Sequence, residues 1–200
     1  MSIPASILFA YLMLPDDTQS ADHAQPGRIY TSTMDAVTRG TTDGLHIWLN
    51  VMAILVVLIA LVALVNMCVG ALPAVGGAPL SLERIVGWLF APLAWLMGIP
   101  WSEAPQAGSL LGIKTVLNEF LAYLRLAELG RGALSDRTRL IAIYALCGFA
   151  NFASMGIQIS GIAAMAPERR ADLNELAFRS LVGATLASCM TGAIVGIVAF

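Results

Sequence analysis

The chain has 200 residues, of which 58% are hydrophobic and only 12% are charged, and its formal net charge is −2. A soluble domain carries about 25% charged residues, so this composition argues against an ordinary soluble protein. No basic stripe runs along the sequence, so nucleic acid is not expected as a partner.

The charged residues leave four long runs uncharged, at 44–82, 85–102, 140–167 and 180–200. A helix needs about 20 apolar residues to cross a bilayer core of roughly 30 Å, and three of the four runs reach that length. The predicted fold class is therefore all-α, a polytopic helical membrane protein in a lipid bilayer.

The first segment, 1–14, is apolar but reaches only about 21 Å as a helix. No Lys or Arg precedes it, as one would in a secretory signal. We therefore predict a partial transmembrane helix, with Met1 an internal methionine of a longer protein or the chain a truncated fragment. Residues 15–43 are polar and are expected to form a water-exposed connection with some helix around 33–40.

The second apolar segment, 45–72, is the clearest transmembrane helix, with Asn50 and Asn66 as its polar interruptions. Prolines and glycines then break the chain. Segment 81–98 follows, with Ser81 as a candidate N-cap. Its spread tryptophans and its central Pro92 favour a helix at the membrane interface, although a short, kinked spanning helix fits the same residues.

Segment 102–130 contains two short amphipathic pieces that flank 112–118, and neither piece is long enough to cross a bilayer. Two short helices that meet at a polar, glycine-containing tip describe a re-entrant hairpin. Such a tip is tolerated at membrane depth where it is buried in protein or lines a wet cavity.

The last two segments, 138–165 and 172–200, are long enough to span the bilayer. The first is interrupted by GFANFAS at 148–154, which predicts a broken transmembrane helix whose backbone groups are available to a ligand. The second carries small residues at spacings close to the small-xxx-small pattern of tightly packed helices. Arginines lie at both ends of 138–165, so charge does not decide the membrane orientation.

The hairpin tip holds the first candidate site, Lys114, Asn118 and Glu119. An ionisable side chain at the centre of a membrane helix costs at least about 2.5 kcal/mol and indicates a function. Glu119 offers carboxylate oxygens to hydroxyls or to a cation, and Asn118 can both donate and accept hydrogen bonds. Two bland interpretations stay open: Lys114 and Glu119 pair with each other, or the tip lies in water.

The broken helix holds the second candidate site, Phe149, Asn151 and Ser154. Asn151 and Ser154 are spaced i and i+3, so on a helix they share one face. A phenyl ring beside an amide and a hydroxyl suits a flat polar ring or a sugar. The alternative is that Asn151 and Ser154 form hydrogen bonds between helices, as is common in membrane bundles.

Enzyme activity is not indicated by the sequence. His23 lies in a polar loop, His46 opens a helix, and no serine has a Gly-x-Ser-x-Gly setting. No metal site or bound cofactor is predicted, because His, Cys and acidic residues do not cluster at metal-ligand spacing. The three cysteines, Cys68, Cys147 and Cys189, lie in apolar segments and are expected to be small buried hydrophobic side chains.

Two stretches together carry a family resemblance: GIKTVLNEFLAY at 112–123 and YALCGFANFASMGI at 144–157. The chain resembles the C-terminal half of the concentrative nucleoside transporter family, which has the signature Gly-x-Lys-x-x-x-Asn-Glu-Phe-x-Ala-Tyr. The signature is complete here, as Gly112, Lys114, Asn118, Glu119, Phe120, Ala122 and Tyr123. The resemblance covers nearly all of the chain.

The resemblance implies half of an inverted-repeat transporter fold and a nucleoside symporter coupled to Na⁺ or H⁺ that works by alternating access. It also implies a homotrimer in the plasma (inner) membrane, with segment 45–72 in the trimer scaffold. The coupling-ion site and the base-binding residues would belong to an N-terminal half absent from this chain. Purine or pyrimidine preference therefore stays open, and residues 1–200 alone are not expected to transport.

The substrate-binding residues that the resemblance implies are Glu119, Phe149, Asn151, Ser154, Asn118 and Ile47. Glu119, Asn151 and Ser154 are expected to form hydrogen bonds with the ribose hydroxyls. Phe149 is expected to pack against the sugar or the base, and Ile47 to place an apolar side chain near the base.

Lys114 and Asn118 match the signature, and both are expected to have a structural or gating role. The alternative function is a non-transporting membrane subunit, or a truncated remnant, that keeps half of the site. Uridine uptake driven by an imposed Na⁺ or H⁺ gradient separates the two functions.

Overall fold

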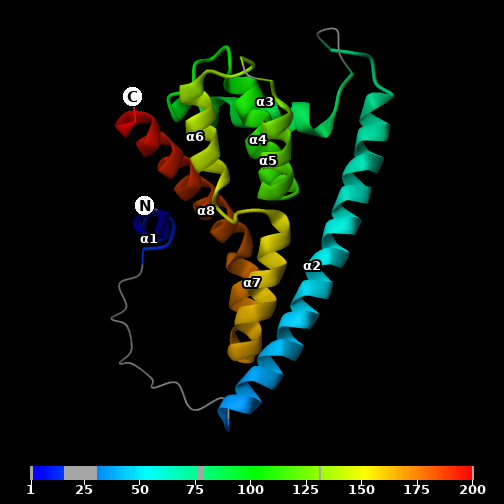
Figure 1. Ribbon diagram of the computed structural model, residues 1–200, viewed down its shortest axis with the longest axis vertical. Coiled ribbons are helices and arrows are strands. Elements are labelled where there is room, and N and C mark those ends of the chain that lie inside the picture. Colours follow the sequence, from blue (N-terminus) through cyan, green and yellow to red (C-terminus); the bar gives the residue numbers. More distant parts are fainter. Residues whose placement is uncertain (1, 16–30, 76–78, 131, 200) are drawn as a thin grey trace.

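The computed structural model of the chain describes residues 2–15, 31–75, 79–130 and 132–199, and within these ranges every regular element is a helix. The elements are α1 (Ser2–Met13), α2 (Thr33–Gly70), α3 (Leu82–Leu96), α4 (Ala104–Val116), α5 (Glu119–Glu128), α6 (Asp136–Leu146), α7 (Phe152–Met165), the short 3₁₀ helix η1 (Pro167–Arg169) and α8 (Arg170–Val198). Figure 1 shows α2 along one side of the molecule, with α3 to α6 grouped at one end and α7 nearer the other.

Helix α2 is longer than the sequence pattern indicates. The sequence suggests a short helix around 33–40 and a separate apolar helix from 45, whereas the structure has one helix of 38 residues. Ser32 caps it by accepting from the backbone N–H of Asp35, and Asp35 pairs with Arg39 at 2.7 Å. The polar turns continue into the apolar ones because no proline intervenes, and a change of polarity does not end a helix.

Helices α3 and α4 pack closely against each other, and glycines make the close approach possible. A Cβ atom on Gly108 of α4 would lie 2.5 Å from the carbonyl oxygen of Gly87 of α3. A Cβ atom on Gly112 would lie equally close to the Val86 side chain. Ser81 caps α3 as predicted, by accepting from the N–H of Arg84 at 3.3 Å.

Helix α8 supports α6, α7 and α1, which all pack against it (Figure 1). Gly192 and Gly196 lie against Ile141 of α6, and a Cβ atom on either glycine would be within 2.9 Å of that residue. The small residues of this segment thus allow close helix packing, as their spacing suggested. Helix α8 therefore packs against both helices that flank the break between α6 and α7.

Length and hydropathy identify α8 as the one helix, within the described residues searched, that is long and apolar enough to cross a membrane. Residues 59–70 of α2 form a shorter apolar helical stretch, as do α1 and much of α7.

Candidate functional site

The tip of the hairpin is the short connection between α4 and α5. Helix α4 continues to Val116, so the non-helical part is limited to Leu117 and Asn118 rather than extending over 112–118. Asn118 caps α5, because its side-chain oxygen accepts from the backbone N–H of Leu121 at 2.9 Å. Glu119 is therefore the first residue of α5 and lies at the positive end of that helix.

The break between α6 and α7 is built in the same way. Helix α6 ends at Leu146 and α7 begins at Phe152, with Asn151 as its N-cap. The Asn151 side chain accepts from the N–H of Ser154 at 2.7 Å, and the Ser154 hydroxyl accepts from the N–H of Asn151 at 3.1 Å. The two residues therefore meet as a capping box, whereas the i, i+3 spacing suggested one helical face.

The hairpin tip and the helix break meet through Glu119 and Asn151. The side-chain amide of Asn151 donates a hydrogen bond of 3.1 Å to the Glu119 carboxylate. Asn151 is 1% exposed and Ser154 3% exposed, while Glu119 is half-buried. The structure thus brings together three of the predicted ribose-binding residues, which come from two different elements.

Lys114 and Tyr123 connect the hairpin to the end of α6. The Lys114 amino group donates to the carbonyl oxygen of Ala145 at 2.9 Å, and the Tyr123 hydroxyl donates to that of Ile143 at 2.7 Å. A Lys114–Glu119 pair, one of the alternatives that the sequence left open, is not among the ion pairs of the described residues. The partner of Lys114 is a backbone carbonyl, which no sequence pattern identifies.

The other two predicted site residues lie differently. Phe149 is in the break between α6 and α7, and its ring is 51% exposed, so it remains available for packing against a ligand. Ile47 is within α2, but its side chain lies outside the described part of the structure.

The polar groups at the junction retain capacity for a ligand. Within the described residues, one Glu119 carboxylate oxygen accepts from Asn151, and the other has no protein donor. The Ser154 hydroxyl donates to the Asn151 carbonyl oxygen at 2.6 Å and accepts one bond, which leaves one lone pair. The junction can therefore accept hydrogen bonds from hydroxyl groups and, through the second amide hydrogen of Asn151, donate one.

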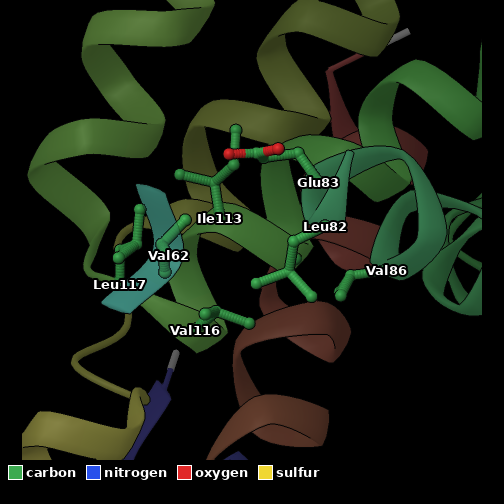
Figure 2. A pocket seen from close by; sticks show the side chains of 8 residues that line it. Val62, Leu82, Glu83, Val86, Ile113, Val116 and Leu117 are labelled. Carbon is green, nitrogen blue, oxygen red and sulfur yellow. The ribbon is translucent and has the colours of Figure 1, made fainter. Parts of the chain in front are cut away.

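Two cavities of the described structure lie elsewhere. A space of about 10 Å³ lies among apolar side chains of α2, α3 and α4. Figure 2 shows these side chains, with the Glu83 carboxylate beside them. This volume is that of about one water molecule. An open groove of about 800 Å³ lies between α2 and the hairpin and has Arg84, Arg125 and Glu128 among its charged lining residues. Neither lining includes Glu119 or Asn151.

A polar contact that the sequence reasoning missed joins α2 to α3. Asn66 accepts from the backbone N–H of Leu82 at 2.7 Å and donates to the Glu83 carboxylate at 3.0 Å. The only signal was an isolated asparagine in an otherwise apolar run, which does not identify the partner.

Comparison with known proteins identifies the family of the chain. The family described as "Na+ dependent nucleoside transporter C-terminus" matches residues 1–196. The uncharacterized transporter YutK of Bacillus subtilis is 39% identical over 202 residues, which cover 98% of the chain and 50% of the relative. The nucleoside permease NupC of Helicobacter pylori is 36% identical over 203 residues, which cover 98% of the chain and 49% of the relative.

The solved structures agree with these relatives. A structure of CNTnw in an inward-facing substrate-bound state aligns with a TM-score of 0.81 at 39% identity, over 97% of this chain and 47% of that one. The chain spans about half the length of the curated relatives it matches. The fold, the sequence match and the complete signature together show that the chain belongs to the Na⁺ dependent nucleoside transporter family, in its C-terminal part.

Proposed function

We propose that the chain is the C-terminal half of a cation-coupled nucleoside symporter and contributes the ribose-binding side of the substrate site. The observation that carries this proposal is the contact between Glu119 at the hairpin tip and Asn151 at the helix break. Vicinal ribose hydroxyls need strong acceptors in a dry site, and a carboxylate supplies charge-assisted hydrogen bonds there. Ser154 adds one acceptor, and Phe149 adds an apolar surface for the sugar or base.

The placement in the membrane follows from the same proposal. Helices α4 and α5 form a re-entrant hairpin, α6 and α7 form a broken transmembrane helix, and α1, α2 and α8 are spanning segments, α1 only in part. Helix α3 lies at the membrane interface. Irregular backbone at membrane depth is tolerated where it lines a cavity, and in this chain both irregular points meet at the Glu119–Asn151 contact.

Transport is proposed to proceed by alternating access in the plasma (inner) membrane, with the protein assembled as a homotrimer. The hairpin and the broken helix move against the scaffold that contains α2 while the nucleoside stays bound. The family description supports Na⁺ as the coupling ion, and H⁺ is the alternative.

The test is uptake of labelled uridine by cells that produce the complete protein, with an imposed Na⁺ or H⁺ gradient. The wild type is expected to accumulate uridine with one of the two gradients, and Glu119→Gln to abolish uptake. Glu128→Gln is the matched control, because Glu128 is an exposed carboxylate at the other end of α5. Unchanged uptake by Glu119→Gln removes Glu119 from the site, and no uptake by the wild type with either gradient supports a non-transporting remnant.

A further inference from the structure

The end of α6 has backbone carbonyls that its own helix does not satisfy, as at any helix C-terminus. The N–H of Cys147 bonds to the carbonyl of Tyr144, which leaves the carbonyl oxygens of Ile143 and Ala145 for other donors. Both donors come from the hairpin: Tyr123 bonds to Ile143, and Lys114 bonds to Ala145. The hairpin therefore caps the helix that precedes the break.

The hydrogen bond between Lys114 and the Ala145 carbonyl lies in a closely packed part of the structure. Lys114 is 1% exposed and is the only lysine of the chain. A Cβ atom on Gly148 would lie 3.4 Å from the Lys114 amino group and would overlap the Ser188 hydroxyl, so a side chain at this position would force Ser188 to move. A buried amino group is costly unless it is hydrogen-bonded, and the negative end of a helix favours a cation. Lys114 is thus stable only while the end of α6 stays against the hairpin.

The two donors are placed symmetrically about the tip of the hairpin in the sequence. Lys114 precedes the cap residue Asn118 by four positions, and Tyr123 follows Glu119 by four positions. One donor therefore comes from each helix of the hairpin, and both bond within the last turn of α6. Asn151 lies only a few residues beyond that turn.

We propose that Lys114 and Tyr123 form a hairpin clamp, a pair of positioning residues that fixes the end of α6 and so keeps the Asn151 amide within reach of Glu119. The clamp touches no substrate and acts through Asn151 and Glu119. Its effect on nucleoside affinity rests on the proposed function, whereas its effect on the contact between hairpin and α6 does not.

The first test measures opening of the clamp directly. The complete protein, in membranes, is treated with an amine-reactive N-hydroxysuccinimide ester, and modification of Lys114 is followed by peptide mass spectrometry. The wild type is expected to react slowly, because the amino group is buried and bonded. Tyr123→Phe removes one hydroxyl of the clamp and is expected to increase the modification rate of Lys114 at least about threefold, the loss of one hydrogen bond.

Tyr144→Phe is the matched control, because Tyr144 is an exposed residue of α6 whose hydroxyl makes no hydrogen bond in the described structure. It is expected to leave the modification rate of Lys114 unchanged. Equal rates for wild type and Tyr123→Phe, or an equal increase in Tyr144→Phe, overturn the clamp.

The second test separates positioning from general support of the fold. In Tyr123→Phe and Lys114→Met, the KM for uridine uptake is expected to rise, at least about tenfold for Lys114→Met, the loss of one charge-assisted hydrogen bond. The maximal rate per transporter in the membrane is expected to stay near that of the wild type. A lower maximal rate with unchanged KM in Tyr123→Phe overturns the positioning role, and this variant decides the matter if Lys114→Met does not fold.

The two proposals fail separately. If the wild type neither takes up uridine nor shows slower Lys114 modification when uridine is present, the proposed function fails. Faster modification in Tyr123→Phe than in Tyr144→Phe then still supports the contact between hairpin and α6.

Discussion

Glu119 and Asn151 are 32 positions apart in the sequence and are joined by a hydrogen bond of 3.1 Å. Glu119 is the first residue of α5 and Asn151 caps α7, so two helix N-termini meet at one carboxylate. The partial positive charge of helix N-termini stabilises a carboxylate. Through its bond to Asn151, the Glu119 carboxylate therefore lies beside the N-terminus of a second helix.

Asn151→Asp tests the donor that faces Glu119. An aspartate keeps the N-cap of α7 but removes the amide donor and places a second carboxylate beside Glu119. Nucleoside affinity is expected to fall about ten- to a hundredfold, since a hydrogen bond to a charged group contributes about 1.5–3 kcal/mol. Binding of uridine to the purified complete protein, measured by calorimetry, gives the value.

Asn174→Asp is the control for this change, because Asn174 is an exposed residue of α8 and the substitution adds the same charge away from the predicted site. Its effect on affinity is expected to be smaller. Equal losses in the two variants would show that the Asn151 amide has no particular role in the site.

Ser154→Ala tests the hydroxyl that closes the capping box. The variant leaves the Asn151 N–H without its acceptor, so the thermal unfolding temperature is expected to fall, with a loss of about 1 kcal/mol in unfolding free energy. If Ser154 also accepts a ribose hydroxyl, the KM for uridine rises about three- to tenfold. Thr185→Val is the control, a buried helical hydroxyl whose bond lies within α8. A normal KM in Ser154→Ala would restrict Ser154 to capping.

Gly108→Ala tests the contact between α3 and α4. The new Cβ atom would lie 2.5 Å from the Gly87 carbonyl oxygen, and the helices must separate to admit it. Overpacking of this kind costs about 1–3 kcal/mol, which thermal unfolding in detergent measures. Gly40→Ala in α2 has nothing within 4 Å and is expected to be neutral or slightly stabilising. Similar unfolding temperatures for the two variants would contradict the close approach.

Glu103 gives the fold a pH-dependent contact between the start of α4 and the start of α6. Hydrogen bonding by the Thr138 hydroxyl and by the hydroxyl and backbone N–H of Ser135 lowers the pKa of Glu103. Because the pKa is lower in the folded state, the stabilisation is complete above the unfolded pKa of about 4.3 and is lost as the pH falls through the folded value.

The difference in unfolding temperature between the wild type and Glu103→Gln is therefore expected to be largest at neutral pH and to shrink on acidification below about pH 4. Glu175→Gln, at an exposed position of α8, controls for the change in net charge. A difference that does not vary with pH would argue against the ionised form of Glu103 as the cause.

The sequence predicted the helical class and the family, because the apolar runs and the signature residues can be read locally. The substrate-binding residues stay a prediction, of which the structure brings Glu119, Asn151 and Ser154 together. Apolar runs indicate membrane helices, and an asparagine before a helix is a common N-cap. The pattern was less reliable for helix ends. The i, i+3 spacing of Asn151 and Ser154 predicts one helical face, whereas the two residues form a capping box. The spacing alone does not show that α7 begins after Asn151.

The contacts that assemble the site could not be predicted in this way. The partner of Lys114 is a backbone carbonyl 31 positions away in the sequence, and the partner of Tyr123 is a backbone carbonyl 20 positions away. Every residue has a carbonyl group, so the identity of the acceptor carries no signal in the sequence. Only the approach of α6 to the hairpin selects Ala145 and Ile143.

The glycine contact between α3 and α4 also limits how the molecule can move. Gly108 lies directly on the backbone of Gly87 and Ala91, and a shift of one helix along the other would bring larger side chains into the space that only glycine fits. The two helices therefore cannot slide past each other without first separating. A displacement of α4 that keeps this contact must therefore carry α3 with it.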